Sequence, residues 1–319
     1  MEQPTIEPIA RELLKAELTP ERRVRKTNKA DNDIYIFRAT ECPMLMQEVG
    51  RLREDSFREA GGGTGLEVDI DLEDTLEDGY FQLIVWDSTD EQIVGGYRFI
   101  ICRDENPKNL STEHYFNFSP QFRKEYLPHT IELGRSFVQN AYQPRRNRKG
   151  IYALDNLWDG LGALIVFCDS RYFFGKVTMY TSYNQQARNI LFSFIHRYFG
   201  DNEKLVTALN PLDMGYDNAE LEKIFTGATY EENYKIMMQS IRELGENIPP
   251  LINAYMSLSP TMKTFDTFLN NDFGEVEETG ILITMDDIYE DKYRRYTEWD
   301  ELEVERDKTI KHWRQRLGY

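Results

Sequence analysis

The chain has 319 residues, of which 40 % are hydrophobic and 13 % aromatic, and its formal net charge is −17. This length and composition allow a packed core in one large domain or two, while the acidic balance argues against a nucleic-acid-binding protein. No apolar run approaches the roughly 18 residues that a membrane-spanning helix needs, so a transmembrane protein is not expected.

Residues 1–30 are expected to form a polar N-terminal arm with a short helix over residues 7–18. The basic run from Arg22 to Lys26 follows this helix. Such a run is usually a solvated face, although it could also meet an acidic partner.

A first strand is predicted over residues 33–39, where apolar and polar side chains alternate. Apolar residues then recur at helical spacing over residues 43–60, which predicts a helix that the three glycines at 61–63 end. No strand directly precedes these glycines, so a phosphate-binding loop is only weakly indicated.

Asp69, Asp71 and Asp74 form a D-x-D-x-x-D pattern that resembles a calcium loop. Calcium is nevertheless not expected, because Asp74 stands where such a loop needs glycine and Tyr80 stands where it needs a glutamate. Two interpretations remain open: a plain acidic loop, or a carboxylate cluster that pairs with arginines elsewhere.

Two apolar segments, residues 81–87 and 92–102, flank a short polar turn and predict a β-hairpin. Arg98 interrupts the second segment. A charged side chain in a buried strand is strongly destabilising unless it has a partner, so Arg98 should form an ion pair.

A further strand is predicted over residues 131–138, which carry Glu132 and Arg135. Three positions apart, these side chains would face opposite ways in a regular strand unless the backbone bulges between them. The pair could be a structural salt bridge or part of a functional site.

A strongly basic turn over residues 142–150 comes next, and a helix N-capped by Asp155 is predicted to run to residue 169. Because helix N-termini favour negative charge, this junction is a candidate anion site. A strand at 176–180 and a helix at 184–198 complete an α/β order with a mixed sheet.

The C-terminal third is expected to be mostly helical over residues 201–247, with helices at 219–225 and 231–244. The tail from 299 to 317 has a narrow apolar face, which favours a docked or dimer-forming helix over a membrane anchor.

Four blocks of this sequence resemble the GCN5-related N-acyltransferases (GNAT superfamily), in the branch of acyl-homoserine lactone synthases and the N-acyltransferases of ornithine and other amino-acid lipids, often labelled hemolysins. They are the D-x-D-x-x-D pattern, Gly95-Gly96-Tyr97-Arg98, Glu132-Leu133-Gly134-Arg135-Ser136 and Leu157-Trp158-Asp159-Gly160-Leu161. A fifth block, Ile248 to Tyr255, is similar to the lipid enzymes alone, so the resemblance covers roughly residues 33–296.

The resemblance implies an α/β fold of the α+β type: a mixed, mostly antiparallel central sheet with splayed middle strands, flanked by helices. Four regions are expected. They are an N-terminal arm (1–30), the acyltransferase core (31–200), a region that completes the sheet and contains a helical insertion (201–297), and a charged C-terminal helix (298–319).

The implied reaction is transfer of a fatty acyl group, with or without a 3-hydroxyl, from an acyl-carrier-protein thioester to the amine of an amino acid. This would be the first step of amino-acid-lipid synthesis. Glu132 is the candidate general base, directly or through one water, because the amine must lose a proton to attack. Backbone N–H groups on a splayed strand would stabilise the oxyanion. Arg98 and Arg135 complete the catalytic set, neutralised by Asp69, Asp71 and Asp74.

The acyl donor is expected to be held by the basic loop and the start of the following helices. The usual pyrophosphate motif of the superfamily fails after Gln143, which disfavours tight CoA binding and favours an acidic acyl carrier protein. The basic run at 22–26 could add to the same patch. The candidate phosphopantetheine-binding residues are Arg145, Arg146, Arg148, Lys149, Gly150 and Asn184.

Two alternatives stay open: a short-chain acyl-CoA-dependent N-acetyltransferase, or a non-enzymatic protein that binds acyl carriers or lipids. No tightly bound cofactor is expected; acyl carrier protein or acyl-CoA would be a co-substrate. No metal is expected either, since the four histidines form no ligand pattern. The three cysteines lack close spacing, which favours a reduced, cytoplasmic protein, with contact at the inner membrane face left open.

Overall fold

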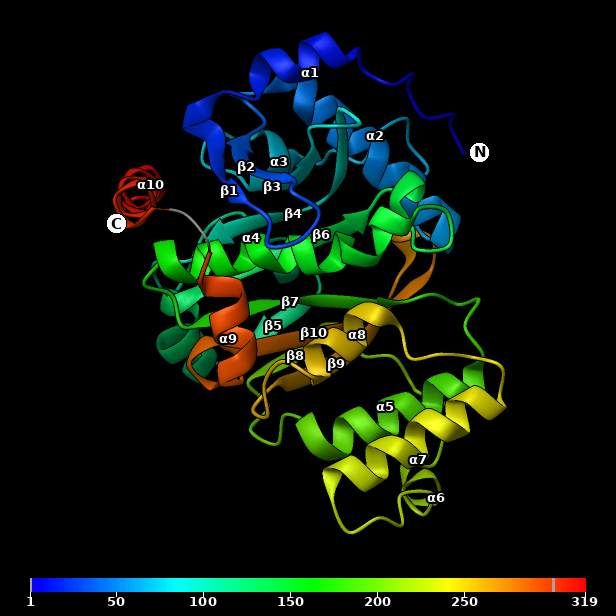
Figure 1. Ribbon diagram of the computed structural model, residues 1–319. Coiled ribbons are helices and arrows are strands. Elements are labelled where there is room, and N and C mark those ends of the chain that lie inside the picture. Colours follow the sequence, from blue (N-terminus) through cyan, green and yellow to red (C-terminus); the bar gives the residue numbers. More distant parts are fainter. Residues whose placement is uncertain (1, 300–301) are drawn as a thin grey trace.

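An eight-stranded sheet runs through the molecule in the order β1-β2-β3-β4-β6-β7-β10-β9, with helices on both faces (Figure 1). The computed structural model describes residues 2–299 and 302–319. The strands are β1 (Arg23–Lys26), β2 (Asp33–Arg38), β3 (Phe81–Asp87), β4 (Gln92–Ile101), β6 (Thr130–Val138), β7 (Tyr172–Met179), β9 (Lys263–Asn270) and β10 (Val276–Thr284), with β5 (Phe116–Phe118) and β8 (Val206–Ala208) forming a separate small pair.

Helices cover the sheet in two layers. They are α1 (Arg11–Glu17), α2 (Pro43–Ala60), α3 (Leu72–Thr75), α4 (Ala153–Phe167), α5 (Gln185–Phe199), α6 (Asn218–Glu222), α7 (Tyr230–Glu243), α8 (Pro250–Met256), α9 (Glu290–Thr297) and α10 (Glu303–Leu317). The larger apolar core joins one sheet face to α4, α8, α9 and α10, and a second core joins the opposite face to α1 and α2.

The middle of the sheet is where the strands separate. Every neighbouring pair of the sheet is antiparallel except β6 and β7, which run parallel and pair over only three residues each, Thr130–Glu132 with Tyr172–Phe174. Beyond these pairs the two strands splay. The predicted fold class, with its splayed middle strands, is therefore confirmed.

A β-bulge in β6 sets the direction of its charged side chains. The register with β4 shifts between the pairs Gly96–Phe137 and Arg98–Gly134, and Arg135 adopts a left-handed conformation with φ 49°. This extra residue brings Arg135 onto the sheet face that Glu132 occupies. The sequence required such a bulge if the two charges were to share one face, and the structure contains it.

Several predicted elements agree with the structure. The helix over 43–60 is α2 residue for residue, and Gly61 ends it in the left-handed conformation at φ 100°. The hairpin is β3 and β4. The helix predicted over 7–18 begins only at Arg11, because Pro8 disfavours helical backbone in the residue before it.

Two local predictions are wrong. The basic run after α1 is not a solvated face: it contains β1, whose Arg25 is fully buried and donates to the carbonyl oxygens of Lys26 and Tyr296. Asp155 does not cap α4, because this helix already begins at Ala153. The carboxylate of Asp155 instead forms an ion pair with Arg295.

The C-terminal third supplies helices and, among its described residues, three strands: β9 and β10 of the large sheet and β8 of the small pair. Helices α5 and α7 pack together beyond β9, while β10 inserts between β7 and β9 (Figure 1). The tail helix α10 docks on α4, where its buried Trp313 stacks on Phe167 and donates to the carbonyl of Arg23. The helix predicted over 299–317 included residues 300 and 301, which lie outside the described residues. None of the described helices is long and apolar enough to cross a membrane.

Candidate active site

A cavity of about 420 Å³ opens where β6 and β7 separate, on the sheet face that carries α2 and α3. One part of its wall is charged and the other is apolar. The charged part is formed by Asp71, Glu73, Arg98, His114, Arg135, Lys176 and Glu278, and the apolar part by Phe57, Tyr115, Tyr180, Pro249, Pro250, Leu251 and Phe273.

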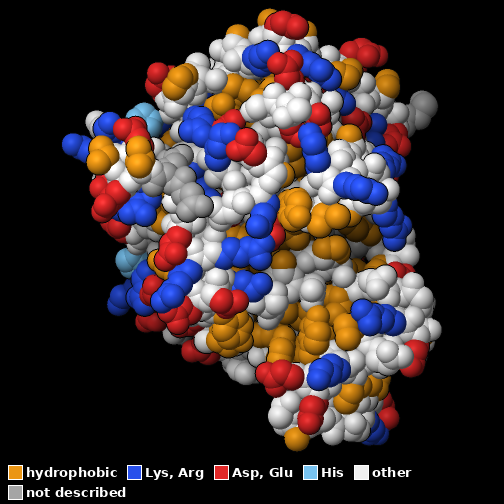
Figure 2. Space-filling model, in the orientation of Figure 1, with side chains coloured by type: hydrophobic (Ala, Val, Ile, Leu, Met, Phe, Trp, Pro, Cys, Tyr) orange, Lys and Arg blue, Asp and Glu red, His pale blue; other side chains and the backbone are white. Residues whose placement is uncertain are grey.

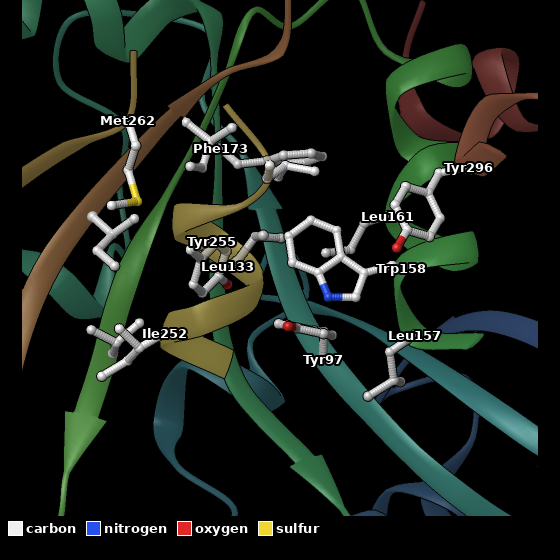
Figure 3. Close-up of a cluster of buried hydrophobic side chains, with 14 of the residues drawn as sticks. Tyr97, Leu133, Leu157, Trp158, Leu161, Phe173, Ile252, Tyr255, Met262 and Tyr296 are labelled. Carbon is white, nitrogen blue, oxygen red and sulfur yellow. The ribbon is translucent and has the colours of Figure 1, made fainter. Parts of the chain in front are cut away.

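On the other face of the sheet, a second space adjoins the same gap. This narrow space of about 30 Å³ is lined by β6, β7, β10 and α8, and it shares Gly134, Arg135 and Lys176 with the larger cavity. Figure 3 shows α8 over this gap, with Tyr255 close to Leu133 of β6 and Trp158 of α4 pointing toward Tyr97. The rings of Trp158 and Tyr255 lie 5.4 Å apart. The two spaces therefore adjoin the same gap, one on each face of the sheet.

The arginines of the two central strands pair with the acidic block, as the sequence suggested. Arg98 Nη1 lies 2.5 Å from Asp71 and 3.2 Å from Asp74. Arg135 Nε lies 2.9 Å from Asp69. The acidic segment is thus a cluster of carboxylates that pair with arginines. The side chain of Asp71 also caps α3, because it accepts a hydrogen bond from the backbone N–H of Asp74.

A third arginine, Arg53 of α2, belongs to this network and was missed by the sequence analysis. Its guanidinium is fully buried, lies 3.1 Å from Asp74 and also donates to Gln82. Burial alone would raise the pKa of Asp74, but the charges of Arg53 and Arg98 outweigh it and hold that pKa below its usual range. The buried carboxyl is therefore ionised.

Gly134 lets Arg98 lie flat against β6. A Cβ atom at position 134 would stand 3.3 Å from Arg98 Nε, tighter than an ordinary contact. The glycine of the Glu-Leu-Gly-Arg block therefore has a packing explanation: it leaves room for the neighbouring guanidinium.

Glu132 is fully buried and does not itself line the cavity. Its carboxylate accepts hydrogen bonds from three hydroxyl groups, those of Tyr80, Ser111 at 2.9 Å and Thr112. Of these three donors, only Ser111 also lines the cavity. Any proton that passes from the cavity to Glu132 would therefore cross the Ser111 hydroxyl.

Two further pairs at the cavity wall were not singled out from the sequence. Lys176 of β7 lies 2.8 Å from Glu278 of β10 and 4.1 Å above the ring of Tyr115. Burial lowers the pKa of Lys176, and Glu278 partly opposes this effect. His114 Nε2 lies 2.8 Å from Glu73 at the rim. Burial would raise the pKa of Glu73, but the hydrogen bond with His114 contributes to a net lowering.

The candidate donor-binding residues divide into paired and unpaired groups. Lys149 contacts Asp87 and Asp90, each at 2.7 Å, and Arg146 pairs with Glu59. Arg145 and Arg148 are exposed and form no ion pair with any described residue.

Gly150 and Asn184 have local structural explanations. A Cβ atom at Gly150 would stand 2.0 Å from the carbonyl oxygen of Tyr142, so only glycine fits there. Asn184 caps α5 by accepting from the N–H groups of Gln186 and Ala187. A role of either residue in donor binding stays a prediction.

The face above α8 is hollowed and apolar. Figure 2 shows hydrophobic side chains gathered in this hollow, with Lys and Arg side chains around it. A groove of about 250 Å³ between α4, α8 and α9 contributes to it and includes Ile151, which is 64 % exposed. At the start of α4, the buried polar atoms of Asn156 and Trp158 Nε1 have no hydrogen-bond partner among the described residues.

No group of three or more metal-ligating side chains is found within residues 2–299 and 302–319. All three cysteines are buried and free, and burial raises the pKa of Cys42 and Cys168 to about 12. These thiols are therefore not ionised at neutral pH, and the cavity offers no thiolate nucleophile.

Comparison with known proteins adds independent evidence. Residues 52–153 match the family model described as acetyltransferase (GNAT) domain. A protein of Bacteroides thetaiotaomicron named glycine N(alpha)-acyltransferase is 54 % identical over 298 residues, which cover 91 % of this chain and 88 % of that protein. A protein of Phocaeicola vulgatus with the same name is 52 % identical over 300 residues, or 92 % of each chain. No solved structure matches this chain.

Proposed function

The chain belongs to the GNAT superfamily and is an N-acyltransferase, and we propose that it moves a fatty acyl group from a carrier-protein thioester to the amino group of glycine. The observation that carries the proposal is the pair of spaces that adjoin the gap between β6 and β7 from the two faces of the sheet. A thioester entering from the α8 side would meet an amine that enters from the α2 side. Glycine as the acceptor rests on the names of the two relatives.

The reaction needs no covalent enzyme intermediate. The neutral amine attacks the thioester carbonyl, a C–N bond forms, and the C–S bond breaks with release of the carrier thiol. The edges of β6 and β7 that face the gap beyond Glu132 and Phe174 have no partner strand across it. Their backbone N–H groups are therefore suitable donors for the developing oxyanion.

Glu132 is proposed as the proton acceptor, acting through Ser111. The ammonium form of the amine cannot attack, so one proton must leave before the C–N bond forms. Ser111 lines the cavity and already donates to Glu132. It can accept a proton from the amine while passing its own proton to the carboxylate. The hydroxyl thus takes the part that a bridging water would otherwise play.

An acyl carrier protein is the proposed donor because the entry face suits an acidic partner with an extended arm. Arg145 and Arg148 leave their charges free beside an apolar hollow that includes Ile151. Such an arrangement would steer an acidic protein and increase its rate of association. The unpaired Nε1–H of Trp158, whose side chain lines the groove between α4, α8 and α9, is a suitable donor to an amide carbonyl of a phosphopantetheine arm. The product, an acylated amino acid, would be delivered to a membrane as a lipid precursor.

The test uses purified enzyme with glycine and one fatty acyl chain offered as acyl carrier protein thioester or as acyl-CoA. We expect N-acylglycine by mass spectrometry, with kcat/KM at least about tenfold higher for the carrier protein, a difference typical of electrostatic steering. Glu132→Gln should lower kcat about 100-fold or more, within the range of a lost general base, and Ser111→Ala should lower it less because water can replace the hydroxyl.

Each part of the proposal can fail separately. If no acylated glycine forms with either donor, glycine is not the acceptor. If acyl-CoA is used as well as the carrier thioester, the donor assignment is wrong while the reaction stands. If Glu132→Gln retains wild-type kcat, the carboxylate only anchors the hydroxyls of Tyr80, Ser111 and Thr112.

A further inference from the structure

Arg135 has hydrogen-bonding capacity that the protein does not use. Its Nε contacts Asp69, whereas neither terminal nitrogen has a hydrogen bond to any described residue; Nη2 lies 3.6 Å from Asp71. The side chain is 17 % exposed and lines both the large cavity and the narrow gap. A guanidinium held by one edge presents its other edge to a ligand, in the geometry that suits a carboxylate.

The backbone at Arg135 is strained in order to aim this side chain. A φ of 49° is unfavourable for a residue other than glycine, and such outliers persist where the surrounding structure holds them. Arg135 is the bulged residue of β6, and its guanidinium lies 4.7 Å above the ring of Phe273. The ring and Asp69 together fix the orientation of the guanidinium at the cavity.

A second cation approaches from the opposite strand. Lys176 of β7 lines the same two spaces, and its ammonium donates one hydrogen bond among the described residues, to Glu278. An ammonium has three donors, so Lys176 keeps capacity for a further acceptor. The two cations therefore come from the two strands that splay, one from each side of the gap.

The charged wall also carries carboxylates. Asp71 and Glu73 line the cavity beside Ser111, and Arg98, although it lines the cavity, is only 2 % exposed and engaged with Asp71 and Asp74. A wall that offers both spare cationic donors and carboxylates suits a small zwitterion better than a simple amine. An α-amino acid carries both charges.

We propose that Arg135 and Lys176 bind the carboxylate of the acceptor amino acid and thereby select amino acids over amines that lack one. The inference rests on the proposed function, because it deals with the acceptor of that reaction. It gives Arg135 a role in recognition that neither its sequence block nor the names of the relatives supply.

The test compares glycine with glycinamide, which has the same amine but no carboxylate. In the wild type, kcat/KM for glycine should exceed that for glycinamide by about 100-fold, the size of a charged hydrogen-bonding contact. In Arg135→Gln this preference should fall to within about threefold, mainly through KM for glycine. Arg135→Lys should retain part of the preference, because the charge remains while the second donor is lost.

Arg171→Gln is the matched control. Arg171 also stands next to β7 and forms an ion pair, with Asp286 at 3.6 Å, but it does not line the cavity. The Arg171→Gln variant should keep the wild-type preference for glycine over glycinamide. Circular dichroism and thermal melting identify a variant that has lost its fold, and Arg135→Lys then decides the question.

If Arg135→Gln lowers kcat/KM for glycine and glycinamide by the same factor, Arg135 does not bind the carboxylate and the inference is wrong. Calorimetric titration of glycine into the enzyme separates this result from failure of the proposed reaction. Glycine binding that weakens in Arg135→Gln supports the carboxylate contact even if no acyl transfer occurs. Binding of equal strength in both proteins overturns it.

Discussion

Two sets of charges flank the bulge in β6, and they differ in how completely they are paired. The inner set, Arg53, Arg98 and Asp74, is buried, and each member has an ionic partner within the set. The outer set, Arg135 and Lys176, keeps donors that no described residue uses. Disrupting a buried, paired charge destabilises the protein, so such charges fix the geometry of the site. Partly exposed charges with spare donors can instead bind a ligand. Similar residue types in one site thus have different tasks.

The largest expected effect comes from breaking the inner set. Arg53→Met removes one of the two arginines that neutralise Asp74 and should lower the free energy of unfolding by about 3–5 kcal/mol. The matched control is Arg146→Met, whose pair with Glu59 is exposed and should contribute less than about 1 kcal/mol. Urea denaturation measures both. Equal effects of the two substitutions would remove the distinction between the sets.

The same variant should also change the response to acid. Asp74 has a lowered pKa in the folded protein, so the stability that its ion pairs contribute is present above the carboxyl's unfolded pKa and is lost as pH falls. With one arginine removed, that loss should begin at a higher pH. Unfolding curves recorded from neutral to acidic pH test the direction of the shift.

A second, intermediate effect concerns the outer set. Glu278→Gln removes the carboxylate that holds up the pKa of Lys176, which burial already lowers. Lys176 should then lose its proton more readily as pH rises above neutral, and KM for glycine should increase by up to about tenfold toward alkaline pH. The wild type should change less over the same range. In the double variant with Lys176→Met the additional pH dependence should vanish; if it persists, Lys176 is not its source.

The smallest expected effect extends the comparison to the surface. Arg145→Ser with Arg148→Ser removes two unpaired charges and should raise KM for an acyl carrier protein thioester about threefold to tenfold at low salt, with little change at high salt. Arg146→Ser is the control, since its charge is already engaged by Glu59. Equal effects of the paired and unpaired arginines on KM would show that pairing does not distinguish them here.

The sequence could predict those parts of the site whose signal lies within a short stretch of the chain. Glu132, Arg135 and Arg98 stand out because charges interrupt apolar strands, and the acidic block offers them partners. The helix over 43–60 and the hairpin follow from periodicity alone. These signals are local in the chain.

The remainder depends on register and on packing between distant segments. Arg53 reads as an ordinary charge on an amphipathic helix, and only the position of α2 against the sheet buries it. Lys176 and Glu278 come from strands about a hundred residues apart, and nothing local fixes that Lys176 pairs with Gly280 and not with a neighbour. Ser111 and Thr112, two of the three hydroxyl donors to Glu132, lie in a loop-rich segment without periodicity.

The position of β10 has a consequence for the order in which the molecule can assemble. Strands β1, β2, β3, β4 and β6 are neighbours in the sheet and nearly so in the chain, so this half can form as soon as residues 23–138 are synthesised. β7 pairs with β6 over three residues only and needs β10 on its other side. One wall of the cleft must therefore wait for the last quarter of the chain to leave the ribosome. A nascent protein would hold its arginine–aspartate network well before it could hold a substrate.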